Sequence, residues 1–119
     1  MRMRFVLCGL LLFTWAVPFL LAQDSVKADP KHYSVVSEND QVRIVRVHYG
    51  PHEKSVMHSH PNLVAIFLND ATGKFVFPDG KTQDFTSKAG QAQYVSASTH
   101  LPENTGDMPM DIVLVELKM

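Results

Sequence analysis

The sequence predicts an all-β domain, a sandwich or barrel, behind an apolar N-terminal segment. From His32 onward no segment has the apolar period of a helix, whereas short runs rich in valine, isoleucine, phenylalanine and threonine recur between turn signals. About eight such runs follow one another at regular spacing, which is the pattern of a β-sandwich or β-barrel. The chain contains no internal repeat and no sign of a second domain.

The first 22 residues have the pattern of a secretory signal peptide. Met1–Arg4 is basic, Phe5–Leu21 is almost wholly apolar, and Ala22 is a candidate cleavage residue. We therefore predict a periplasmic or secreted protein with no membrane partner after cleavage. Leu20 is larger than the residue usually found three positions before a cut, so an uncleaved membrane anchor is the alternative.

The composition of the remaining chain excludes some partners. Residues 1–22 contain two of the eleven basic residues and none of the twelve acidic ones, so residues 23–119 have a net charge of −3 with histidine neutral. No basic cluster is present, and we expect no nucleic-acid partner. Cys8 is the only cysteine, which leaves the exported part without a disulfide. A small domain without such cross-links has a thin stability margin, and we expect a homodimer.

The expected elements begin after a polar stretch, residues 23–33, that we interpret as a linker or arm. Tyr33–Ser37 and Gln41–Tyr49 are the first two predicted strands. The apolar phase changes near Ile44 and Val45, which predicts a bulge or a strand buried on both faces. Gly50 and Pro51 end the second strand.

The rest of the chain predicts several more strands with turns between them. Pro78–Gly80 is a hairpin turn between two of these strands, and residues 69–73 are a further turn. Residues 100–106 form either a loop or a strand edge. The predicted strands are 56–60, 63–68, 74–77, 81–85, 91–95 and 111–118.

Two histidines on one predicted strand are the first candidate site. Alternate residues of a strand share a face, so His58 and His60 project the same way, about 7 Å apart at the strand rise. That separation allows both imidazoles to bind one metal ion if another element supplies a third ligand. His100, on a later predicted segment, is the candidate for that ligand.

Other polar residues are weaker candidates. Tyr94 and Glu103 are candidates to line the pocket or to support a histidine ligand, although a core tyrosine and a solvated glutamate are the simpler interpretations. We expect His52 to lie in a loop outside the site. His32 and His48 have no partner by spacing, and we expect both on the surface.

The order of these histidines resembles that of the small single-domain cupins, the RmlC-like jelly rolls. The first matching motif is Gly50 to His58-Ser-His60, and the second runs from Gly90 through His100 to Asn104. The likeness covers residues 34–118. It implies a cupin-type double-stranded β-helix, or jelly-roll barrel, with the three histidines as metal ligands. It also implies that Asn104 braces a loop, although we keep Asn104 as a candidate for the pocket or for supporting a ligand.

The chain departs from the cupin motifs in three ways. Seven residues instead of five separate Gly50 from His58, and Ser96 and Ser98 replace the usual proline and glycine. The usual glutamate ligand is missing, since Val64 and Ala65 occupy its positions. What remains resembles the minority of cupins that bind metal through histidine alone. The implied cofactor is one divalent transition metal, and imidazole ligands do not choose among Zn, Fe, Mn, Ni and Cu.

These observations predict an exported metal-binding cupin with a small organic molecule as its ligand or substrate. An anionic substrate is compatible with the site, because an all-histidine site leaves the double positive charge of the metal uncompensated. The alternative is a non-catalytic ligand-binding or assembly cupin with a degenerate, metal-free site. Cupins include enzymes of many kinds as well as binders, so the resemblance specifies neither a reaction nor a substrate.

Overall fold

The structure is a computed structural model that describes residues 23–119. The predicted signal peptide, residues 1–22, lies outside the described residues. Within the described part of the chain, no helix is long and apolar enough to cross a membrane. The elements are α1 (Ser25–Ala28), β1 (Tyr33–Glu38), β2 (Val42–Tyr49), β3 (His58–His60), β4 (Leu63–Phe67), β5 (Ala71–Val76), β6 (Thr82–Ser87), β7 (Ala92–Val95), β8 (Ser98–Asn104) and β9 (Met110–Leu117).

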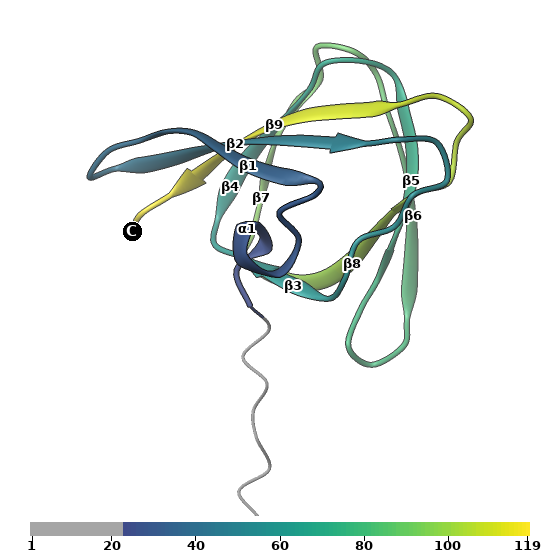
Figure 1. Ribbon diagram of the computed structural model, residues 1–119, viewed down its shortest axis with the longest axis horizontal. Coiled ribbons are helices and arrows are strands. Elements are labelled where there is room, and N and C mark those ends of the chain that lie inside the picture. Colours follow the sequence, from purple (N-terminus) through teal and green to yellow (C-terminus); the bar gives the residue numbers. More distant parts are fainter. Residues whose placement is uncertain (1–22) are drawn as a thin grey trace, which may run out of the picture.

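The strands form two antiparallel sheets that curl around one interior (Figure 1). The larger sheet has the order β1-β2-β9-β4-β7, and the smaller has the order β3-β8-β5-β6. Neighbours in each sheet are mostly distant in sequence, as in a jelly roll. The predicted all-β fold class is therefore confirmed.

The core of the larger sheet comes from the alternation of side chains along β2 and β9. Val45, Val47 and Tyr49 of β2 are buried, while the intervening residues of β2 are exposed. On β9, every second residue from Met110 onward is buried. Inward side chains of both strands therefore face the interior of the barrel.

Three expectations about local structure need correction. The predicted bulge lies in β1, between Val35 and Ser37, opposite Val45 and Ile44 rather than within β2. Residues 98–104 form a complete strand, β8, because they pair with both β3 and β5. The predicted turn at 69–73 is shorter, since β5 already begins at Ala71.

Gly73 lies inside β5 and is needed there for close packing rather than for a turn. A Cβ atom at Gly73 would lie 2.3 Å from Cζ of Phe85 and 2.8 Å from the carbonyl oxygen of Glu103. Both distances are shorter than a real contact allows. The glycine therefore permits the aromatic ring to lie directly against the backbone of β5.

Residues 23–33, predicted as a linker or arm, pack against one end of the barrel. Helix α1 lies beside β3 (Figure 1), and the Ser59 amide donates a hydrogen bond of 2.9 Å to the Gln23 carbonyl. Ser25 and Asp29 are buried. This segment therefore covers the strand that carries His58 and His60.

Candidate metal centre

The three predicted histidines form one cluster inside the barrel. His58 and His60 come from β3, and His100 lies directly opposite His58 on β8. The ring centroids are 4.7 Å apart for His58 and His60, 5.2 Å for His58 and His100, and 5.1 Å for His60 and His100. One nitrogen atom from each ring lies within 4.8 Å of the other two, and all three side chains are buried. The cluster is thus of a size that one metal ion can bridge.

Each imidazole has a polar partner at its Nδ1 atom. An ionised carboxylate can only accept a hydrogen bond, so Glu116 requires the proton of His60 on Nδ1 and leaves Nε2 as a free ligand atom. His58 Nε2 is buried and has no hydrogen-bond partner among residues 23–119. The three Nδ1 contacts are His58 with Ser55 Oγ at 3.2 Å, His60 with Glu116 Oε2 at 3.3 Å, and His100 with Ser98 Oγ at 3.2 Å.

A chain of charged groups extends from His60 to the N-terminal segment. Arg43 Nε donates to Glu116 Oε1 at 2.6 Å, and the guanidinium of Arg43 also donates to the carboxylate of Asp24. Burial by itself raises the pKa of Glu116, but hydrogen bonds from His60 and Arg43 outweigh it and the pKa is lowered. Glu116 is therefore an ionised, buried acceptor that fixes the orientation of the His60 ring.

A second chain of polar groups supports His58. Ser55 Oγ donates to Asp29 Oδ2 at 2.5 Å, and the same carboxylate oxygen lies 2.7 Å from His32 Nδ1. The prediction that His32 is a surface residue is wrong. Its side chain is buried and stacks on Tyr49, with ring centroids 4.4 Å apart, because the N-terminal segment folds back over it.

Two of the three histidines, His58 and His100, are held in the neutral form that metal binding requires. Burial, together with the nearby His60, lowers the pKa of His58 to about 4. Burial, together with the nearby His60 and His58, lowers the pKa of His100 to about 3. At neutral pH both imidazoles are therefore unprotonated, so no proton has to be displaced from them before a metal binds.

The remaining sequence candidates lie outside the cluster. Tyr94 lines the cavity beside the histidines, and 58% of it is exposed. The carboxylate of Glu103 forms an ion pair with Lys74 at 3.3 Å. His48 and His52 have largely exposed side chains that pair with Asp111 and Asp107, respectively. The expectations that His52 lies outside the site and that His48 is on the surface hold.

Asn104 is almost completely buried and braces a loop, as the cupin resemblance implies. Its Nδ2 atom donates to the carbonyl oxygens of Gly50 at 3.0 Å and Met108 at 2.8 Å. Its Oδ1 atom accepts a hydrogen bond of 3.0 Å from the amide of Gly106. All of its side-chain hydrogen bonds are to backbone atoms, so it joins the loop after β2 to the loop between β8 and β9.

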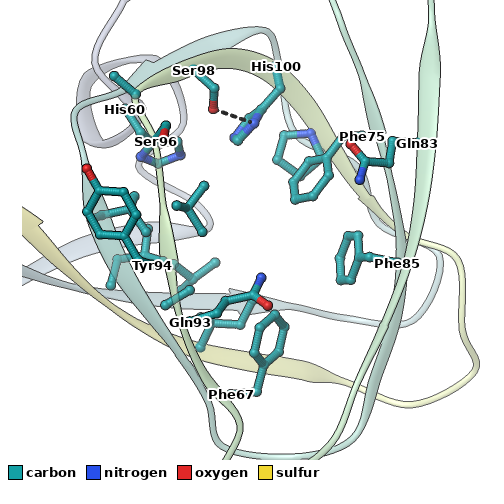
Figure 2. A pocket seen from close by; sticks show the side chains of 18 of the residues that line it. His60, Phe67, Phe75, Gln83, Phe85, Gln93, Tyr94, Ser96, Ser98 and His100 are labelled. Carbon is teal, nitrogen blue, oxygen red and sulfur yellow. Dashed lines mark hydrogen bonds between the residues drawn. The ribbon is translucent and has the colours of Figure 1, made fainter.

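A cavity of about 510 Å³ adjoins the cluster, and His60 and His100 line it (Figure 2). This volume lies in the range of pockets that bind small organic molecules. Phe75 also lines the cavity and stacks on His100, with ring centroids 4.6 Å apart. A molecule in the cavity would therefore lie next to two of the three histidines.

Sequence reasoning missed the two acidic residues that support the cluster, Glu116 and Asp29. The sequence contains no clear signal for Glu116, because Val113, Val115 and Leu117 are as apolar as Ile112 and Leu114. Only the structure shows which set of β9 faces inward and that Glu116 belongs to it. Asp29 follows a four-residue helix in an irregular polar segment, where no periodicity indicates which side chains are buried.

Solved structures with the same fold were found, whereas no sequence-family model and no curated protein sequence matches the chain. A cupin domain from Bordetella pertussis Tohama I is 18% identical, with a TM-score of 0.67, over 73% of this chain and 92% of that one. A double-stranded β-helix protein from Klebsiella pneumoniae is 23% identical, with a TM-score of 0.58, over 71% and 74%. An RmlC-like cupin from Methanocaldococcus jannaschii is 15% identical, with a TM-score of 0.57, over 71% and 77%. At these identities the likeness concerns the fold, and the chain has the double-stranded β-helix fold of the cupins.

Proposed function

We propose that this protein binds one divalent transition metal through His58, His60 and His100 and binds a small organic molecule in the adjoining cavity. The observation that carries the proposal is the convergence of three buried imidazoles, each with a partner at Nδ1. Nitrogen ligands of this kind suit Zn, Fe, Mn, Ni and Cu alike.

The unpartnered Nε2 atom of His58 favours this proposal over a degenerate, metal-free site. A buried polar atom without a partner is costly and is rarely retained without a purpose. A cation held by the three rings would supply the missing partner.

A metal bound by three protein ligands retains open coordination positions, and there it supplies Lewis-acid chemistry toward an oxygen atom of a bound molecule. The residues of the chain itself orient the three imidazole rings and exclude water from them. Glu116 and Ser55 fix two of the rings, and Phe75 covers one face of the third. Whether the site performs catalysis or only binding depends on the molecule that enters the cavity.

Metal analysis tests the proposal. Protein purified without a histidine tag is expected to bind close to one zinc ion per chain and to lose it in His58→Ala, His60→Ala and His100→Ala. His52→Ala is the matched control, because this exposed histidine is paired with Asp107 outside the cluster. Chelator is expected to lower the melting temperature of the wild-type protein and of His52→Ala, but not that of the three cluster variants. Full metal content in all three cluster variants, or none in the wild type after incubation with zinc, contradicts the proposal.

Export is a second part of the proposed function, based on the basic and apolar pattern of residues 1–22. Cleavage after Ala22 is expected to give a mature chain that begins at Gln23 and is free of the membrane. The intact mass of the protein from a fractionated producing cell tests this. A full-length chain in the membrane fraction would instead favour the uncleaved anchor.

A further inference from the structure

The aromatic residues of the described chain are concentrated around one cavity. All four phenylalanines and all three tyrosines of residues 23–119 line it. The phenylalanines are Phe67, Phe75, Phe77 and Phe85.

The phenylalanines form a continuous wall that starts at the histidine cluster. Phe75 stacks on His100, and Phe85 stacks on Phe75 with ring centroids 4.8 Å apart. Phe67 follows at 6.2 Å from Phe85. In Figure 2 these rings occupy the side of the cavity away from His60, whereas Ser96 and Ser98 lie at the histidine end.

No aspartate, glutamate, lysine or arginine of the described chain lines the cavity. Its polar lining away from the histidines consists of neutral groups, such as the amides of Gln83 and Gln93 (Figure 2). A metal held by the histidines would therefore be the only centre of charge in the cavity. A negative group far from the histidines would meet phenyl rings and amides instead of a cation.

We propose that the cavity selects a flat, mainly apolar molecule with a single oxygen-donor group. The donor lies at the histidine end, and the ring or apolar body lies against Phe75, Phe85 and Phe67. Such a body gains by leaving water and by stacking on the wall. The orientation of the donor group depends on the proposed metal site. The binding of the apolar body to the aromatic wall does not depend on it.

The same geometry disfavours molecules with a second charge at their far end. Burying an anion without a paired cation or a full set of hydrogen bonds is costly. Compact polyanions would leave the phenylalanine wall unused. The cavity is therefore suited to ring compounds that are neutral or have charge at one end only, and not to linear dicarboxylates.

Three carboxylates with the same donor test this inference. Acetate, benzoate and terephthalate are titrated into zinc-loaded and metal-free protein, and binding is followed by shifts of backbone amide signals in NMR spectra. Zinc content is measured separately. Benzoate is expected to bind at least about tenfold more tightly than acetate, because only benzoate buries a ring. Terephthalate is expected to bind at least about tenfold more weakly than benzoate, because its second carboxylate is buried on the wall.

Two variants test whether the phenylalanine wall causes the preference for benzoate over acetate. Phe85→Leu keeps an apolar side chain and is expected to reduce the preference for benzoate over acetate at least about threefold. Leu68→Ala, on a half-exposed residue that does not line the cavity, is expected to leave it unchanged. The inference is overturned if benzoate binds no more tightly than acetate to both the zinc-loaded and the metal-free protein. If the protein binds no zinc but still binds benzoate more tightly than acetate, the metal proposal fails. The proposal of a flat, mainly apolar ligand is then retained.

Discussion

The carboxylate of Glu116 lies 3.3 Å from Nδ1 of His60, although 56 residues separate the two in sequence. Only the pairing of β9 within the larger sheet brings this acid behind a histidine of the smaller sheet. Glu116 is buried and is held on its other side by Arg43. Acidic residues behind a ligating histidine fix the tautomer and increase the basicity of the ring.

The first prediction concerns Glu116→Gln. The amide lacks the negative charge that strengthens the His60 ligand, so the zinc affinity is expected to fall about 10–100-fold. A competition titration against a chromophoric chelator measures this fall. Glu103→Gln is the control, because Glu103 is paired with Lys74 and is expected to leave the affinity unchanged. Equal zinc affinities for the wild type and Glu116→Gln would remove Glu116 from the site.

Ser55→Ala gives the second prediction. The change removes the hydroxyl that links Asp29 to His58, and the zinc affinity is expected to fall about tenfold. The visible spectrum of the cobalt-substituted protein is expected to shift, because the His58 ring is no longer held in one orientation. Ser59→Ala is the matched control on β3, since its hydroxyl bonds Thr99 instead of a histidine. An unaltered spectrum in Ser55→Ala argues against a positioning role.

The third prediction is the pH dependence of the stability of metal-free protein. The pKa values of His58 and His100 in the folded state, about 4 and about 3, lie below the ordinary value of about 6.5. The unfolded chain therefore takes up these protons first as the pH falls. Stability is complete above about pH 6.5 and is lost progressively toward pH 4 and below, by about 2 kcal/mol per histidine at pH 5.

Urea denaturation at pH 7 and pH 5 measures this loss. A double variant, His58→Gln with His100→Gln, is expected to show a much flatter profile because neither glutamine titrates. His48→Gln, on an exposed histidine, is the control and is expected to retain the wild-type slope. A wild-type slope in the double variant would show that other groups cause the acid sensitivity.

Asn104→Ala gives the fourth prediction, which separates stability from metal binding. The change leaves part-buried hydrogen-bonding groups of the Gly50, Gly106 and Met108 backbone without their partner, at an expected cost of about 2–3 kcal/mol. Zinc affinity is expected to change little, because the Asn104 side chain makes no hydrogen bond to a histidine of the cluster. Asn39→Ala is a control on an exposed asparagine that caps two backbone amides. Comparable destabilisation by both variants would contradict the bracing role.

The sequence was sufficient to predict the histidine cluster because a strand has a period of two. His58 and His60 share a face whatever the rest of the fold, and the cupin resemblance supplied His100 as the third member. Most strands of the barrel were predictable because short apolar and β-branched runs stand between turn signals, as in β2 and β9.

The surroundings of the cluster were not predictable in the same way. Contacts of Glu116 and Asp29 with the site depend on the pairing of distant strands and on the path of an irregular segment. His32 appeared to be a surface residue because nothing local indicates that Asp29 and Tyr49 enclose it. Gly73 was assigned to a turn because sequence does not distinguish a glycine needed for φ freedom from one needed for close packing.

The packing at Gly73 has a consequence for the shape of the cavity. The glycine does not line the cavity, yet the ring of Phe85, which does, lies against its Cα atom. An alanine at this position would have to displace that ring or spread β5 from β8. The shape of the ligand compartment is therefore adjustable by a single methyl group placed behind its wall, without a change to any residue that a ligand would touch.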